Sequence, residues 1–300
     1  MVSIYSITDN TKNFVDKPQS TKPKEKCSIQ LFDFKKCMEK YEAIVPKFYT
    51  VDFDSIIGRM YVKDYSNTEI NINGNIDGVR QVKNDCWLLA GVLALANTQK
   101  GEEYLRKTLV KTNNNTVVSF KGINTDVIIP KIVLAAAKQS KSYVKGDDNI
   151  LALEVATEYY KKMLIKNNES MQNKSPNLIN GKYSSCNLND PLGGGFSSDI
   201  LYLITGKKST TIFNLQDGCS KEITNLINKI QNNPNKYALT CNFKQRLNGL
   251  YINHAYAIKK IDENFVTLIN PHNSKKEEKI PLEDFCGNVK SITFLDLKNS

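Results

Sequence analysis

Apolar residues follow a helical spacing in the first part of the chain. Between residues 87 and 96 they crowd every face, which predicts a helix that is buried on most sides. Further helical segments are predicted at residues 127–141, 149–166 and 197–206. The first of these begins at Pro130 or just after it, and the last is opened by serines that can cap it and closed by Gly206.

After Gly206 the pattern changes to short apolar runs that alternate with polar residues. One more helix is predicted at residues 221–233, and strands are predicted at residues 237–243, 254–261, 265–271 and 291–297. Helices followed by antiparallel strands are typical of an α+β protein, here with two lobes. We therefore expect a helical lobe over residues 31–206 and a β-rich lobe over residues 207–300. Residues 1–30 are polar and rich in lysine and proline toward their end, which predicts a flexible arm.

The basic charge of the chain does not gather into one block. The formal net charge is +10 over 300 residues, but the lysines are scattered in pairs, and no basic segment is interleaved with aromatic residues. We therefore expect a solvated basic surface with a bias toward acidic partners, and no nucleic-acid partner.

The seven cysteines are an odd number, widely spaced and without a C-x-x-C pair. This spacing predicts neither a disulfide framework nor a zinc site. No signal peptide is recognisable, and no apolar run approaches the roughly 18 residues of a membrane span. We expect a cytoplasmic protein without a membrane partner, although secretion by a non-classical route stays open. The sequence does not indicate the oligomeric state.

One cysteine lies where its thiol can react. Cys86 falls on the first turn of the predicted helix at residues 87–96, directly after Asn84 and Asp85, either of which can cap that helix. Backbone N–H groups at a helix start favour the thiolate, which is the nucleophilic form of the side chain. A thiolate works best beside a basic imidazole, so the histidines are the residues to examine next.

The chain contains two histidines, and one of them opens a predicted strand. If residues 262–264 form a hairpin turn, Ile261 pairs with Phe265, and paired residue numbers sum to 526. His254 and Asn270 then lie on the same side of the sheet as diagonal neighbours, roughly 7–8 Å apart at Cα. Cys86, His254 and Asn270 can thus serve as nucleophile, base and orienter, the arrangement used for acyl transfer.

Four stretches of the chain resemble the calpain-like cysteine proteases. They are "DCWLLA" at residues 85–90, "GGGFSSDILYLITG" at 193–206, "NHAYAI" at 253–258 and "LINP" at 268–271, and they occur in the order that the family has. The resemblance covers residues 75 to 300 and implies a papain-like fold of two lobes with a cleft between them. It implies that Cys86, His254 and Asn270 form the catalytic triad, and that Gly194 and Gly195 line the substrate cleft.

The chain departs from the family's pattern at three positions. The family's oxyanion-hole glutamine lies six residues before the cysteine, where this chain has Arg80, and Gln81 lies five before. Either a shorter loop still brings Gln81 to the oxyanion hole, or the Cys86 N–H holds the oxyanion chiefly alone. His272 replaces the tryptophan that shields the family's His–Asn pair, and Asn84 replaces a glycine.

Many calpain relatives need calcium, and one stretch of the chain superficially resembles a calcium-binding loop. In "NINGNIDG", at residues 71–78, Asp77 is the one charged residue, and Asn84 stands where an EF-hand requires glutamate. We therefore expect no required cofactor or metal, although the family resemblance keeps calcium open.

These features together predict a cysteine endopeptidase that hydrolyses polypeptide substrates through a thioester intermediate. Two alternatives stay open. The same triad can serve an isopeptidase, a deamidase or a transglutaminase, because the papain-like fold hosts all three. The chain can also be an inactive adaptor that binds acidic partners through a basic surface.

Overall fold

The computed structural model describes residues 47–51, 65, 68–166, 174–176, 183–185, 190–246 and 249–298. All of them belong to one compact unit that covers residues 43–300. The flexible arm expected over residues 1–30 lies outside the described residues.

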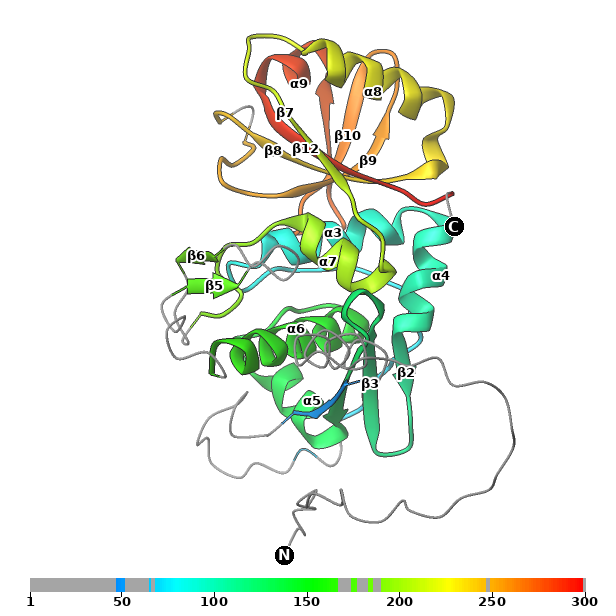
Figure 1. Cartoon of the computed structure of the whole chain (residues 1–300), viewed down its shortest axis with the longest axis vertical. Helices are drawn as coiled ribbons and strands as arrows, with labels where there is room; N and C mark the ends of the chain where they lie inside the picture. Colours follow the sequence, from blue (N-terminus) through cyan, green and yellow to red (C-terminus); the bar gives the residue numbers. More distant parts are fainter. Residues whose placement is uncertain are drawn as a thin grey trace, which may run out of the picture. The chain divides into compact units, whose positions relative to one another are not determined.

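A six-stranded antiparallel sheet forms from the second part of the chain, in the order β11-β10-β9-β8-β12-β7. Its strands are β7 (Thr210–Phe213), β8 (Tyr237–Phe243), β9 (Tyr256–Ile261), β10 (Phe265–Ile269), β11 (Glu277–Pro281) and β12 (Val289–Asp296). Helices α8 (Lys221–Asn232) and α9 (Leu282–Asn288) pack on one face of this sheet through a shared apolar core (Figure 1). The predicted helix at 221–233 and the four predicted strands are thereby confirmed in kind.

The first part of the chain contains five described helices and a sheet of its own. The helices are α3 (Cys86–Ala96), α4 (Gln99–Thr108), α5 (Lys131–Gln139), α6 (Asp148–Lys166) and α7 (Ser197–Thr205). The sheet has the order β1-β4-β3-β2, with β1 (Lys47–Thr50), β2 (Leu109–Lys111), β3 (Asn115–Phe120) and β4 (Thr125–Pro130). Two short turns of 3-10 helix, Lys121–Ile123 and Pro234–Lys236, and a strand pair, β5 (Lys174–Pro176) with β6 (Tyr183–Ser185), complete the described elements.

The structure is therefore α+β, and the part expected as a helical lobe, residues 31–206, also contains a four-stranded sheet that the sequence analysis did not predict. In β3 and β4, buried residues alternate with partly exposed ones, as a half-buried sheet requires. The apolar run at 127–130 continues directly into helix α5, so the sequence analysis included it in the helical segment at 127–141 and predicted no strand there. It belongs to β4, and α5 begins directly after Pro130, where the helix start was predicted.

Helix α3 joins the two parts of the molecule. It packs against α4 and α7 on one side and against β8 and β9 on the other. Ala238, Ala257 and Leu295 of the six-stranded sheet belong to the same buried cluster as α3. A Cβ atom at Gly91 would lie 2.3 Å from Ile200 Cγ2, so glycine allows α3 and α7 to approach closely. Figure 1 shows α3 and α7 between the six-stranded sheet and α6.

The end of α7 follows the prediction, whereas the starts of α7 and α3 depart from it. Gly206 closes α7 in the left-handed conformation, with a φ of 72°. The expected serine cap does not form, because Ser197 Oγ donates to the Trp87 carbonyl at 2.9 Å. Asp85 stands at the N-cap of α3 without a side-chain capping bond, so neither Asn84 nor Asp85 caps that helix as expected.

The β9–β10 hairpin contains a β-bulge that the sequence analysis did not foresee. Next to the turn, Ile261 pairs with Val266 and not with Phe265. Toward the other end, Ile269 pairs with Ala257, and those numbers sum to 526 as predicted. Lys259 is the extra residue between the two registers. Its carbonyl accepts a hydrogen bond of 2.8 Å from Asn97 Nδ2, and Asn97 is the C-cap residue of α3.

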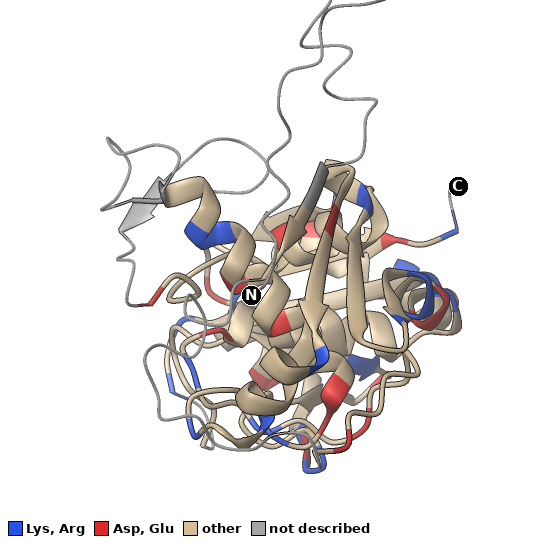
Figure 2. Cartoon of the chain, turned by 90° about the horizontal axis from the view of Figure 1, so that it is seen from below, with Lys and Arg blue, Asp and Glu red and all other residues tan. Residues whose placement is uncertain are grey.

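Cys219 and Cys286 form a disulfide, contrary to the expectation from the cysteine spacing. The bond joins the segment before α8 to α9, and its closed loop spans 67 positions of sequence. Such a long-range pair leaves no local spacing signal. Within the described part of the chain, no helix is both long enough and apolar enough to cross a bilayer. Figure 2 shows lysines and arginines interspersed with acidic residues in that view.

Candidate active site

A cavity of about 510 Å³ brings together most of the residues that the sequence analysis selected. Cys86 at the start of α3 and His254, just before β9, both line it. Gln81 lines it from the loop before α3, and Gly194 and Gly195 line it from the loop before α7. Asn270 does not reach the cavity but lies behind His254, to which it is hydrogen-bonded.

The Cys86 thiol is half-buried in the first turn of α3. Burial raises the pKa of this thiol above its ordinary value. The backbone N–H of Ala255 forms a hydrogen bond that opposes this effect, and the neighbouring carboxyl of Asp85 adds to it. Desolvation thus outweighs the backbone N–H groups at the helix start, which do favour the thiolate as expected. The bond from Ala255 also links Cys86 to the residue that follows His254.

The side chains of His254 and Asn270 form a buried pair. His254 Nε2 lies 2.8 Å from Asn270 Oδ1. The orientation of the amide is fixed independently, since Asn270 Nδ2 donates to Glu278 Oε1 at 3.0 Å and the His272 N–H donates to Asn270 Oδ1 at 3.1 Å. Because Oδ1 is an acceptor, His254 Nε2 must carry the proton. The lone pair of the neutral ring is then on Nδ1, which is the atom available to act as a base.

Three aromatic rings surround the His254 imidazole. Its ring centroid lies 4.3 Å from that of His272, 4.8 Å from that of Tyr256 and 6.1 Å from that of Tyr251. Burial among these groups lowers the pKa of His254 to about 4, although the bond to Asn270 partly counteracts this. His272 does lie over the imidazole, at the place where the sequence comparison put a shielding tryptophan. His272 itself is exposed, whereas His254 and Asn270 are buried.

Gln81 and Arg80 point to different surroundings. Arg80 is exposed and bridges through its backbone to Lys145, while Gln81 lines the cavity. Gln81 Nε2 donates to the Lys83 carbonyl at 2.6 Å, which uses one of its two hydrogens. The Gln81 N–H donates to the Pro271 carbonyl at 2.9 Å, so this loop is attached to the chain just after Asn270. Gln81 therefore reaches the cavity, while its role in the oxyanion hole stays a prediction.

Trp87 positions the two cavity glycines. Trp87 Nε1 donates to the Leu192 carbonyl at 2.9 Å, and the Gly194 N–H reaches the Asn84 carbonyl at 3.4 Å. A Cβ atom at Gly195 would lie 2.5 Å from the Trp87 ring, so only glycine fits there. Gly194 has a φ of +70°, which also favours glycine. The ring next to Cys86 thus holds the loop that forms one wall of the cavity, while a role of the glycines in substrate binding stays a prediction.

The sequence analysis missed Glu278 and Tyr251, which both support the site. Glu278 holds the Asn270 amide from β11, a strand that lay in a polar stretch and was not predicted. Tyr251 donates its N–H to Tyr256 Oη at 2.7 Å and places its ring 5.3 Å from that of His272. Neither residue belongs to a recognisable motif, so the sequence alone contained no signal for them.

A buried pair of carboxyl groups lies beside the Cys86 turn. Asp85 and Glu154 are fully buried, and three of their four carboxyl oxygens have no hydrogen-bond partner among the described residues. Burial raises the pKa of Asp85 to about 7 and raises that of Glu154 well above its ordinary value. A proton shared by the pair would supply the missing donor and leave one negative charge near Cys86 instead of two.

The polar stretch at residues 71–78 is held by backbone hydrogen bonds to the start of α6. Asn71 N–H donates to Asp148, Gly74 N–H donates to Asn149, and Asp77 N–H donates to Asp147, at 2.7 to 2.8 Å. Asp147 also accepts the N–H groups of Asn149 and Ile150 at the helix start. These carboxylates therefore have partners without a cation, and the structure holds no metal-ligand cluster within its described residues.

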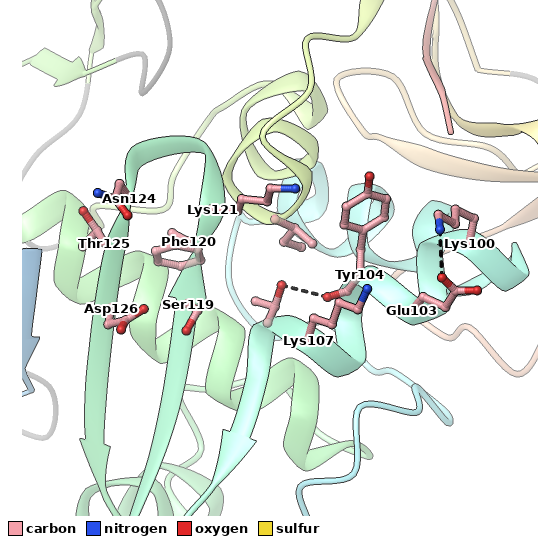
Figure 3. Close-up of a pocket in the computed structure, with 12 residues that line it drawn as sticks. Lys100, Glu103, Tyr104, Lys107, Ser119, Phe120, Lys121, Asn124, Thr125 and Asp126 are labelled. Atoms are coloured by element: carbon pink, nitrogen blue, oxygen red, sulfur yellow. Dashed lines mark hydrogen bonds and ion pairs between the residues drawn. The ribbon is translucent and has the colours of Figure 1, made fainter. Parts of the chain in front are cut away.

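A second cavity of similar volume lies between α4, the β3–β4 hairpin and α7 (Figure 3). Lys100 and Glu103 form an ion pair of 3.0 Å on its rim, and the side chains of Tyr104 and Phe120 also line it. Neither a cysteine nor a histidine lines this cavity, and neither does any residue that the sequence analysis selected. The chemistry-bearing residues are thus in the first cavity.

No protein-family model matches the chain, and no curated protein matches its sequence. The resemblance to calpain-like proteases therefore depends on the four sequence stretches and on the geometry of the site.

Proposed function

We propose that the chain is a calpain-like cysteine endopeptidase with a papain-like fold of two lobes. Cys86 would belong to the first lobe, and His254 and Asn270 to the β-rich second lobe. The observation that carries the proposal is the His254–Asn270 hydrogen bond, which leaves Nδ1 as the basic atom of a ring that lines the same cavity as the Cys86 thiol.

The first half of the reaction forms a thioester. Cys86 Sγ attacks the carbonyl carbon of the scissile peptide bond while His254 Nδ1 accepts the thiol proton. Because burial disfavours both the thiolate and the imidazolium, the resting pair is neutral, and proton transfer accompanies attack. His254 then donates that proton to the leaving nitrogen, the C–N bond breaks, and the amine product departs.

The second half of the reaction regenerates the enzyme. Neutral His254 accepts a proton from water, the resulting hydroxide attacks the thioester carbonyl, and the C–S bond breaks as Cys86 recovers its proton. Asn270 keeps Nε2 as the protonated nitrogen throughout, so Nδ1 faces the reacting atoms in both halves.

Two N–H groups are the candidates for stabilising the oxyanion. The backbone N–H of Cys86 is in the first turn of α3, where N–H groups have no partner within the helix. The second Nε2 hydrogen of Gln81 is not used by its bond to Lys83. Donors of this kind typically contribute about 2.7–4 kcal/mol each to stabilising the transition state.

The proposal is tested by cleavage of an unbiased peptide library with the wild type and Cys86→Ala. We expect the wild type to release new α-amino termini, and Cys86→Ala to release none while its circular dichroism is unchanged. Cys241→Ala is the matched control, because it removes a free thiol that is fully buried in β8 and should leave cleavage intact. Release of ammonia without new termini would instead indicate a deamidase, and equal cleavage by Cys86→Ala would refute the proposal.

A further inference from the structure

The candidate active-site cavity has one permanently charged side chain. Among the described residues that line it, Lys290 is the one lysine, and no arginine, aspartate or glutamate is present. Lys290 is exposed, and within the described part of the chain its ammonium group takes part in no ion pair. Among the described residues, the cavity therefore presents a positive charge that is not in ion-pair contact with a carboxylate.

A β-bulge places Lys290 at this cavity. Val289 pairs with Phe243, and Ser291 pairs with Asn242, so Lys290 is an extra residue in β12 relative to β8. Extra residues of this kind redirect side chains and are frequent beside active sites. The Lys290 carbonyl accepts the Asn214 N–H at 2.8 Å, which fixes the backbone of the bulge next to the end of β7.

Two phenylalanines add exposed apolar surface to the same cavity. Phe196, from the loop before α7, is 58% exposed, and Phe213, at the end of β7, is 59% exposed. No other phenylalanine in the described part of the chain is exposed to this extent. Phe213 pairs with Ser291, the residue after Lys290, so apolar and positive surface adjoin each other across two strands.

The remaining polar groups on this wall are paired with one another. Thr211 and Thr293 share a hydrogen bond of 2.9 Å, and Asn242 Nδ2 reaches Ser291 Oγ at 3.4 Å. These four side chains are uncharged and line the cavity together with Lys290 and Phe213. Lys290 can therefore discriminate between substrates by charge, and the two phenylalanines can do so by apolar contact.

We propose that the cleft selects polypeptide segments in which an acidic side chain adjoins a large apolar one. Lys290 contacts the carboxylate, and Phe213 and Phe196 contact the apolar side chain. This inference rests on the proposed function, since it names the substrate class of that same site.

The charge preference is tested with peptides that contain Leu next to a scanned position occupied by Glu, Gln or Lys. For the wild type, we expect kcat/KM for the best Glu peptide to exceed that of its Gln counterpart by about fivefold, the upper range for an exposed ion pair. The preference should shrink as salt screens the pair. Lys290→Gln should remove it, and Lys290→Glu should reverse it in favour of the Lys peptide.

Lys279→Glu is the matched control, because it changes the net charge equally on β11, at the opposite edge of the same sheet. It should retain the wild-type preference. Equal rates for Glu and Gln peptides at every position, or a preference that Lys290→Glu does not alter, would overturn the inference.

The apolar contact has its own test. Replacing Leu by Ser in the Glu peptide should lower kcat/KM roughly tenfold with the wild type. Phe213→Ala should reduce that difference while it keeps the preference for Glu over Gln. A Leu-to-Ser difference that is unchanged in Phe213→Ala would remove Phe213 from the proposal.

Binding measurements separate this inference from the proposed function. The same peptides, labelled for fluorescence anisotropy, are titrated onto Cys86→Ala and onto Cys86→Ala combined with Lys290→Gln. Tighter binding of the Glu peptide to the first protein but not to the second supports the charge preference even if no peptide is cleaved. Cleavage without any charge preference in rate or binding rejects the inference and leaves the endopeptidase standing.

Discussion

At the scale of single residues, the site depends on which nitrogen of one imidazole carries the proton. The Asn270 amide is held from two sides, by Glu278 and by the His272 N–H, and so it imposes the Nε2–H form on His254. Desolvation keeps both His254 and Cys86 neutral at rest. The proposed reaction therefore requires proton transfer from Cys86 to His254 during attack and does not start from a preformed ion pair.

The low pKa of His254 has a consequence for the pH profile. Above pH about 4 the imidazole is neutral and can accept the thiol proton, whereas below it the ring is already protonated and cannot. We therefore expect the acid limb of kcat/KM to fall near pH 4 and not near the ordinary histidine value of about 6.5. Initial rates across pH 3–8, with stability monitored by fluorescence, check this. An acid limb centred at 6.5 would contradict it.

Gln81 gives a second prediction at this scale. Gln81→Ala removes one oxyanion donor and should lower kcat by about 10²-fold with little change in KM. Arg80→Ala is the neighbouring control, because Arg80 is exposed outside the cavity, and its kcat should stay within about twofold of the wild type. If Gln81→Ala also stays within about threefold, Gln81 does not serve the oxyanion.

Sequence reasoning selected the proposed triad residues because each lies in a distinctive short motif. Cys86 adjoins the one tryptophan, and His254 and Asn270 open and close a predicted hairpin. It could not find Glu278, because this residue lies on β11, a mostly polar strand whose sequence shows no regular alternation of apolar and polar residues. It also could not foresee that burial outweighs the helix start at the Cys86 thiol, because the helix start is visible in sequence whereas the degree of burial is not.

At the scale of elements, the walls of the cavity are positioned by contacts with α3. Trp87 packs on the loop before α7, and Asn97 at the far end of α3 holds the bulge in β9. The periodic helices and four of the six described strands after residue 206 were predictable, since their apolar spacing is regular. The first sheet was not, because β4 continues into α5 without a polar break.

Because Gly195 lies close to the Trp87 ring, we expect a single methyl group added at Gly195 to lower stability. Gly195→Ala would place Cβ 2.5 Å from the indole ring, so the loop or the ring must move. We expect a destabilisation of about 1–3 kcal/mol by urea unfolding, together with a loss of kcat. Gly287→Ala in α9 is the control, since no atom lies within 4 Å of its Cβ position. Equal free energies of unfolding for the two variants would show that the loop accommodates the methyl group without loss of stability.

At the scale of the whole molecule, one disulfide links the two helices that cover one face of the six-stranded sheet. Cys219–Cys286 ties the start of α8 to α9, on the face of the sheet away from α3. The pairing was not predictable, because 67 positions of sequence separate the two cysteines and nothing local connects them. A protein with this bond and a reactive Cys86 must keep one thiol reduced while two others are oxidised.

Breaking this bond should lower stability without removing a reacting group. The combined Cys219→Ser and Cys286→Ser variant should lose about 2–4 kcal/mol of unfolding free energy relative to the oxidised wild type. A mild reductant should lower the melting temperature of the wild type and leave that of the variant unchanged. A wild-type melting temperature that does not respond to complete reduction would contradict the prediction.

The bulge at Lys259 also sets which changes of chain length the fold tolerates. Tyr256, Ile258 and Ile261 all face the core under α8 and α9, although strict alternation would turn Ile261 to the opposite face. If Lys259 were deleted, the two registers would join into one, and strict alternation would still turn Ile261 to that core. The extra residue therefore serves the contact of its carbonyl with Asn97 and not the burial of Ile261. In related chains we expect changes of length in the turn at 262–264 and at position 259, and no other insertion or deletion between His254 and Ile261.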